Sequence, residues 1–118
     1  MPTIIEKPTL IEGVEPKVIR EYVGRLNTGT PGVSIAHMTA PGGWEEPGQR
    51  PEFDEYTLVL RGVVSVEHDG GTVEVGAGQA VHTAAGEWVR YSTPGAEGAD
   101  YISVCLPAFA PDTAHRDD

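Results

Sequence analysis

Acidic and aromatic side chains gather in one short stretch of this sequence. The segment from Gly42 to Glu52 places Trp44, Glu46 and Arg50 among glycines and prolines, which predicts a long loop. Loops held by a rigid scaffold often carry binding residues, so Trp44, Glu46, Arg50 and Glu52 are candidates for contacting a small ligand. The structural alternative is that Trp44 only covers an open end of the fold while the charged side chains face water.

The leading candidate for chemistry is Glu55, a carboxylate at the start of the next predicted strand. Strand side chains alternate between two faces, so Glu55 and Thr57 share one face, and Thr57 is a further ligand-binding candidate. If this face points into an apolar interior, burial raises the pKa of Glu55 and suits a general acid or base near neutral pH. The alternative is a structural ion pair that keeps Glu55 ionised, with Arg50 or Arg90 as its partner.

Two histidines, His37 and His82, are the other residues considered as metal ligands. Transition metals prefer several imidazole or thiolate ligands, and a lone carboxylate is too weak to hold zinc, iron or nickel in water. A site built from Glu55 with Glu52, His82 or His37 is the metal-binding alternative, and His82 is also a candidate for contacting an organic ligand. For each histidine the structural alternative is a hydrogen-bonded ring in or near the core.

Composition limits the class of protein. The 118 residues fit one domain, and 18 acidic against 8 basic residues give a formal charge of -10. This charge repels a phosphate backbone, so we expect no nucleic-acid partner, and anionic membranes are disfavoured too. No apolar run approaches the ~20 residues that cross a bilayer, and no signal-peptide pattern is present, which predicts a cytoplasmic protein. The only cysteine, Cys105, is expected in the core.

Fifteen glycines and ten prolines divide the sequence into short apolar runs, which predicts strands joined by turns. One exception is the stretch from Lys17 to Leu26, where apolar residues recur at helical spacing and favour a short helix over a strand. Residues 107–118 are polar and contain prolines, so we expect them to lie along the surface or fray. Several short strands without intervening helices predict a sandwich, jelly roll or small barrel. The expected strands cover residues 33–40, 55–60, 63–66, 72–75, 79–83, 87–92 and 100–106.

Two motifs select among these folds. Glu55 and Gly62, with six residues between them, resemble the end of the first motif of the cupin family. The segment from Gly78 to Gly86 is similar to the second cupin motif, with Ala84 in place of the usual proline. A resemblance at both places favours the cupin family over other small β proteins.

The resemblance to cupins implies an all-β jelly-roll barrel over residues 33–106, in which Glu55 points inward. Residues 1–32 would then form an arm, with the one short helix, that packs on the barrel or on a partner subunit, and residues 107–118 would form a tail. It also implies a homodimer, because cupins often pair through sheet faces or exchange N-terminal strands.

The sequence departs from metal-binding cupins where their histidines stand. Those proteins carry His-x-His ahead of the motif glutamate, but here Gln49, Arg50 and their neighbours occupy these positions, and Val89 replaces the histidine of the second motif. Of the usual ligand set only Glu55 remains, so no cofactor is expected, with a divalent metal as the alternative. The resemblance places Tyr91 inside the barrel near Glu55, and these two residues are the candidate catalytic pair.

A looser resemblance links the chain to the cupin domain of the ethanolamine-utilisation Q protein. The matching segments are Phe53-Asp54-Glu55, Leu58 to Gly62 and Tyr91 to Pro94. This likeness implies a role in acetyl or aldehyde metabolism. The acetate kinase activity associated with that protein is not carried over, because the chain has no glycine-rich phosphate loop and few basic residues to neutralise a nucleotide.

The sequence therefore predicts a small cupin that binds a small polar metabolite in its barrel without the usual histidine metal cage. Whether the inward carboxylate also performs acid/base catalysis is left open. One alternative is a metal-dependent isomerase, lyase or oxygenase with a non-standard ligand set. Another is a sensor or accessory domain that binds a ligand without turning it over.

Overall fold

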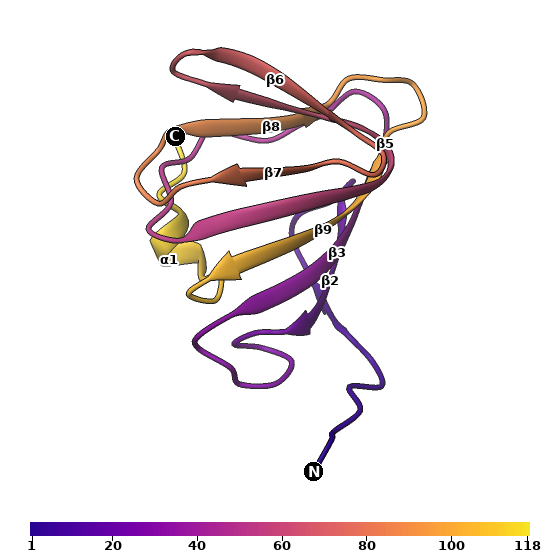
Figure 1. Ribbon diagram of the computed structural model, residues 1–118, viewed down its shortest axis with the longest axis vertical. Helices are drawn as coiled ribbons and strands as arrows, with labels where there is room; N and C mark the ends of the chain where they lie inside the picture. The colour runs from indigo at the N-terminus through magenta and orange to yellow at the C-terminus, as the bar shows by residue number, and fades with distance from the viewer.

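The computed structural model describes residues 1–118 and shows a single curled sheet of nine strands with one short helix near the C-terminus (Figure 1). The predicted all-β class is confirmed. No helix is long and apolar enough to cross a membrane. The elements, in chain order, are β1 (Thr9–Ile11), β2 (Val18–Val23), β3 (Ser34–Ala40), β4 (Trp44–Glu45), β5 (Asp54–His68), β6 (Gly71–Gly76), β7 (Ala80–Thr83), β8 (Val89–Thr93), β9 (Ala99–Leu106) and α1 (Pro111–Ala114).

Strand β5 organises the sheet because it pairs with four others. The strand order is β1-β2-β3-β9-β5-β8-β4, and β6 and β7 also pair with β5. The first half of β5 lies between β9 and β7, whereas its second half lies between β6 and β8. All pairs are antiparallel. In Figure 1 the strands follow one another from β6 and β8 at the top through β7, β5 and β9 to β3 and β2 at the bottom.

Gly62 bends β5 rather than ending it. The sequence predicts two strands, 55–60 and 63–66, but the chain continues as one strand of 15 residues with a register shift between Val59 and Arg61. Gly62 has a φ of +78°, and a Cβ atom placed there would lie 2.0 Å from the carbonyl oxygen of Gly98. The missing side chain therefore lets one strand serve both halves of the curled sheet.

The stretch from Lys17 to Leu26 forms a strand, so the helix predicted there is wrong. Residues 18–23 make β2, which pairs with β1 on one side and β3 on the other. Only Glu21 within β2 is buried, so the helically spaced apolar residues do not form one buried face. Because a helix must be nucleated at a cost, pairing with two neighbouring strands outweighs this weak periodicity.

Two buried clusters fill the interior. The larger one has ten residues, among them Trp44, Val59, Tyr91 and Tyr101. The smaller one joins Phe53 and Cys105 to Ala114 of α1, and Phe109 packs against it. Cys105 is therefore a core residue, as the sequence predicts.

The C-terminal tail closes one end of the fold instead of fraying. Ala108, Ala110 and Ala114 are buried, and Arg116 forms a backbone bridge with Gln49. The backbone N–H of Asp117 donates to the carbonyl of Gly48 at 2.8 Å. These contacts hold the tail against the loop that precedes β5, so the tail is part of the barrel wall.

Replacing Gly62 by Ala should lower the free energy of unfolding by more than about 2 kcal/mol, since the new methyl group meets a backbone oxygen as well as an unfavourable φ. Gly29→Ala is the matched control, because Gly29 also has a positive φ, of +69°, but nothing lies within 4 Å of its Cβ position. Urea denaturation would show the difference. Equal losses in the two variants would contradict the role given to Gly62.

Candidate functional site

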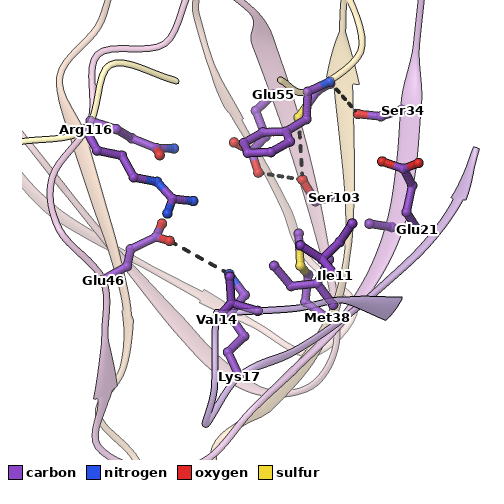
Figure 2. Close-up of a pocket in the computed structure, with 15 residues that line it drawn as sticks. Ile11, Val14, Lys17, Glu21, Ser34, Met38, Glu46, Glu55, Ser103 and Arg116 are labelled. Carbon is purple, nitrogen blue, oxygen red and sulfur yellow. Dashed lines mark hydrogen bonds and ion pairs between the residues drawn. The ribbon is translucent and has the colours of Figure 1, made fainter. Parts of the chain in front are cut away.

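A cavity of about 80 Å³ lies inside the curled sheet, at the end closed by the tail (Figure 2). Its polar wall comes from several parts of the chain: Lys17 just before β2, Glu46 and Gln49 of the loop, Glu55 of β5, Ser103 of β9 and Arg116 of the tail. Apolar side chains such as Ile11, Val14 and Met38 complete it. The cavity is therefore a mixed polar and apolar site that forms only in the folded chain.

Glu55 points into this cavity, as the sequence predicts, and is 8% exposed. Its carboxylate oxygen Oε2 accepts a hydrogen bond of 2.5 Å from the hydroxyl of Ser103. Burial raises the pKa of the Glu55 carboxyl, and the Glu46 carboxylate adds to this rise. The hydrogen bond from Ser103 and the Lys17 ammonium act in the opposite direction. The alternative, an ion pair with Arg50 or Arg90, is not formed, because Arg90 pairs with Glu67 and Glu45 and Arg50 donates to a backbone carbonyl.

Tyr91 lies behind the cavity rather than on its wall. Its ring belongs to the larger buried cluster, and its hydroxyl is 2.9 Å from Thr83 Oγ1. Burial raises the pKa of the Tyr91 phenol well above its ordinary value, and the Glu55 carboxylate raises it further. The Tyr91 phenol therefore stays neutral.

Lys17 and Glu46 form a buried pair opposite Glu55. Lys17 is 7% exposed, and its Nζ lies 3.9 Å from Glu46 Oε2 (Figure 2). The same ammonium lies 4.3 Å from the ring centroid of Trp44 and 5.4 Å from that of Tyr101, so aromatic faces stabilise its charge. Burial lowers the pKa of Lys17 and raises that of Glu46, while each partner opposes the shift of the other. The face of the Trp44 ring thus packs against the Lys17 ammonium.

Sequence reasoning missed Lys17, Ser103, Arg116 and the side chain of Gln49 as site residues. No motif marks Lys17, which lies in the segment expected to be an arm, and Arg116 lies in the tail expected to fray. Gln49 is 5% exposed, and its backbone bridges Val89 and Arg116. The one sequence signal that could have identified Gln49 as a site residue is its position, which corresponds to a metal-binding histidine of other cupins.

Several predicted site residues lie away from the cavity. Arg50 is exposed and donates to the carbonyl of Gly86 at 2.8 Å, while Glu52 is exposed and contacts the ring of His115. Thr57 is fully buried, and its Oγ1 has no hydrogen-bond partner. His82 is exposed and stacks on Tyr56 with ring centroids 4.5 Å apart. Of the candidates in the loop, only Trp44 and Glu46 reach the interior.

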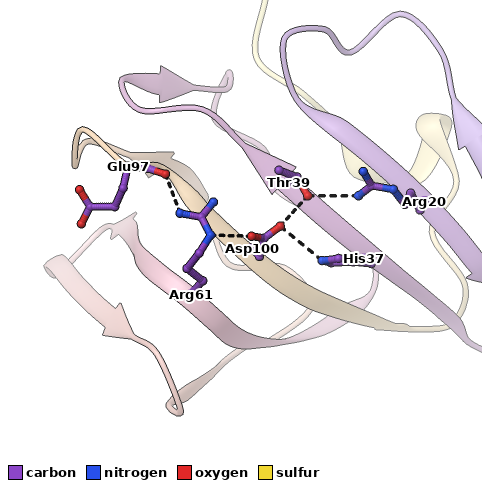
Figure 3. A network of polar contacts seen from close by, with 6 residues as sticks. All are labelled: Arg20, His37, Thr39, Arg61, Glu97 and Asp100. Carbon is purple, nitrogen blue, oxygen red and sulfur yellow. Dashed lines mark hydrogen bonds and ion pairs between the residues drawn. The ribbon is translucent and has the colours of Figure 1, made fainter.

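His37 belongs to a polar network outside the cavity (Figure 3). Its Nε2 lies 3.4 Å from Asp100 Oδ1 but forms no hydrogen bond, whereas Asp100 accepts hydrogen bonds from Thr39 at 2.6 Å and Arg61 at 2.7 Å. The bonds from Thr39 and Arg61 lower the pKa of Asp100. This network ties β3 to β9 and β5, and it gives His37 a structural environment.

The residues present do not fit a metal cage. Glu55 lies inside, His37 lies in the network described above, and His82 and Glu52 are exposed. No three His, Cys, Asp or Glu side chains converge on one point. Around Glu55 the cavity presents an ammonium, an amide and a guanidinium, which are groups that donate hydrogen bonds to an organic ligand.

The chain belongs to the cupin family. The model of the cupin domain matches residues 36–105, which is more than half of the chain. The predicted jelly-roll fold is thereby confirmed. The polar cavity described above occupies the barrel interior of this fold.

Solved structures share the fold at low sequence identity. An ethanolamine utilization protein Q from Salmonella typhimurium LT2 is 23% identical with a TM-score of 0.69, covering 86% of this chain and 80% of that one. An oxalate decarboxylase from Bacillus subtilis is 16% identical with a TM-score of 0.77, and the match covers 98% of this chain and 33% of that one. KdgF from Halomonas sp. is 14% identical with a TM-score of 0.71, and the match covers 86% of this chain and 89% of that one. The resemblance to protein Q is thus confirmed at the level of the fold.

A curated relative extends beyond this chain. The endoribonuclease YbeY of Myxococcus xanthus (strain DK1622) is 42% identical over 113 residues, which are 96% of this chain but 38% of that protein. The chain therefore spans well under half of the length of this relative.

The raised pKa of Glu55 predicts a pH-dependent stability. The folded state holds the Glu55 proton more tightly than the unfolded state, so wild type should lose stability as pH rises from the ordinary value of 4.5 through the raised pKa. Glu55→Gln should remove this part of the pH dependence, and the exposed Glu74→Gln should keep it. The measurement is urea denaturation between pH 4 and 8. Parallel curves for wild type and Glu55→Gln would contradict the assignment.

Proposed function

We propose that this cupin binds a small polar metabolite in the cavity beside Glu55 and that Glu55 exchanges a proton with it. The observation that carries this proposal is the buried Glu55 carboxyl, which accepts a hydrogen bond from Ser103 and faces a cavity of about 80 Å³. A cavity of this size gives room for roughly five to eight water-sized groups, at roughly 10–15 Å³ each. The ligand is therefore a small molecule.

Acid/base chemistry suits the surroundings of Glu55. Because burial raises its pKa, the carboxyl keeps a proton closer to neutral pH than an exposed glutamate does. Ser103 fixes the position of one carboxyl oxygen. The nearby Cys105 thiol is unsuited to act as a nucleophile, since burial raises its pKa and keeps it protonated.

Other activities of the similar proteins are not extended to this chain. Endoribonuclease action requires contact with a phosphate backbone, which the charge of -10 opposes. The likeness to ethanolamine utilization protein Q supports the barrel fold. The interior cavity is proposed as the place of binding because of its own lining. The ligand itself is inferred from the cavity alone.

Binding and turnover can be separated experimentally. A thermal-shift screen of small metabolites should reveal a ligand, and NMR of that ligand should show whether it is converted. Glu55→Gln should still bind it within several-fold but should convert it ~10²- to 10⁴-fold more slowly, the usual contribution of a general acid or base. The exposed Glu52→Gln is the matched control and should behave as wild type. Binding without conversion would instead indicate a sensor, and unchanged conversion by Glu55→Gln would refute the catalytic role.

We also propose that a second copy packs on the outer face of β5 and β9. Tyr56, Leu58, Leu60 and Leu106 are exposed on these strands, and a group of exposed apolar side chains favours association. The pairing of cupins through sheet faces, which the family resemblance implies, supports a homodimer over another partner.

Light scattering after size-exclusion chromatography should give the mass of a dimer. Leu58→Glu places a charge in the middle of this face and should convert the dimer to a monomer at micromolar concentration. Leu26→Glu is the control, because Leu26 is exposed in the turn after β2. A monomeric wild-type protein would refute the proposal.

A further inference from the structure

The cavity is covered on one side by the first strand of the chain and the turn that follows it. Ile11, the last residue of β1, and Val14 of the turn both line the cavity. In Figure 2 their side chains lie below the cavity, with Glu55 and Ser103 above it. Residues 9–16 therefore cover the cavity from this side, and we call this segment the flap.

Few contacts hold the flap in place. None of residues 1–16 is buried, and the first buried residue of the chain is Lys17. Strand β1 lies at the edge of the sheet and pairs with β2 alone, through three residue pairs. Segments with few buried contacts and an exposed backbone open at a much lower cost in free energy than the core does. The flap can thus open while the barrel stays folded.

One side chain fixes the start of the flap to the rest of the chain. The hydroxyl of Thr9 donates to Oδ1 of Asn27 at 2.7 Å, and Nδ2 of Asn27 donates to the carbonyl of Lys7 at 3.0 Å. Nδ2 also donates to the carbonyl of Tyr22 at 2.8 Å, so the amide joins the flap to β2. The Asn27 side chain is therefore a latch that a single substitution removes.

The other end of the flap is fixed by Lys17. The Lys17 ammonium contacts the rings of Trp44 and Tyr101, and the backbone N–H of Lys17 donates to the carbonyl of Val14 at 3.1 Å. Within the turn, Gly13 has a positive φ of +82°, and nothing lies within 4 Å of its Cβ position. The buried Lys17 is thus a fixed point next to a loosely packed turn.

The C-terminal tail also lines the cavity, through Arg116, but it is held more firmly. Three alanines of the tail are buried, and its carbonyl groups accept hydrogen bonds from the backbone N–H groups of Arg50 and Glu52. The indole N–H of Trp88 donates to Asp117 at 2.9 Å. A segment with buried side chains and several backbone hydrogen bonds opens less readily than the flap.

We propose that the flap is the entrance to the cavity and that it opens at the Asn27 latch while its Lys17 end stays in place. The proposal concerns access to the cavity and does not depend on which molecule binds there. A molecule inside the closed cavity would contact Ile11 and Val14, so it could leave only when the flap opens. Flap opening therefore sets how fast a ligand enters and leaves.

Cys105 is a probe of flap opening that the chain already contains. It is the only cysteine, it lines the cavity, and it is 4% exposed. Burial raises the pKa of its thiol and keeps it protonated, so the thiol is unreactive while the cavity is closed. Its rate of reaction with methyl methanethiosulfonate, followed by mass spectrometry, therefore measures how often the reagent reaches the cavity.

Single substitutions loosen the flap and the tail separately. Asn27→Ala removes the latch, and Thr9→Val, which removes only one of its bonds, is the milder variant. Trp88→Phe is the matched variant of the tail, because it removes the bond to Asp117 but keeps an aromatic ring. None of the three substituted side chains lines the cavity, so Cys105 keeps its surroundings. Urea denaturation and circular dichroism give the stability and folding of each variant.

We expect the thiol of folded wild type to be labelled at a rate that rises only weakly with urea below the unfolding transition, since flap opening exposes little surface. Asn27→Ala should be labelled about 3- to 10-fold faster, the effect of losing one or two weak hydrogen bonds, and Thr9→Val should change the rate in the same direction. Trp88→Phe should be labelled at the wild-type rate, even where it unfolds at a lower urea concentration.

Three results would overturn the proposal. The first is no labelling of folded wild type, or labelling that depends on urea as steeply as global unfolding does, since the flap would then stay closed. The second is an unchanged rate in both Asn27→Ala and Thr9→Val. The third is an acceleration by Trp88→Phe that equals or exceeds that by Asn27→Ala, which would make the tail the entrance. None of these results bears on metabolite binding beside Glu55, because thiol labelling requires no ligand.

Discussion

The structure depends on keeping several ionisable groups inside a small β-barrel. Glu55, Glu46 and Lys17 are withdrawn from water, and removing any one of these charges from solvent is costly unless another group compensates. The compensation is incomplete. Ser103 donates a hydrogen bond to Glu55, and the Trp44 ring makes a cation–π contact with Lys17, but the Lys17–Glu46 ion pair is long, at 3.9 Å. An interior of this kind gains from a ligand that supplies the missing contacts. Under the proposed function, the need to accept such a ligand accounts for charged rather than apolar side chains at these positions.

Local pattern was sufficient to predict most of the strands and the orientation of Glu55. Alternating side chains and the two glycine-bounded motifs fix which face of β5 is inward, so Glu55 and the neighbouring Tyr91 were identified correctly as interior residues. The strand β2 was mistaken for a helix because its partners β1 and β3 lie elsewhere in the sequence. The spacing of apolar residues within one segment does not show which distant segments pair with it.

The candidate site was only half visible from sequence for the same reason. Its loop was recognised, but the loop turns Glu46 and Gln49 inward and Arg50 and Glu52 outward, which depends on how β4 and the Gln49 bridge align with β8. Lys17 joins them from 25 residues before the start of the loop at Gly42, and Arg116 from 64 residues after its end at Glu52. A site assembled from both ends of the chain is defined by topology rather than by a motif.

The continuity of β5 through Gly62 has a consequence for how the barrel opens. Because this one strand supplies hydrogen bonds to β9 and β7 at one end and to β6 and β8 at the other, neither half of the sheet can separate without breaking pairs that belong to it. Local opening is therefore confined to peripheral strands such as β1, while the centre exchanges its amide hydrogens only through global unfolding. A molecule bound at Glu55 would consequently slow amide exchange along β5 on both sides of Gly62 as well as around the cavity.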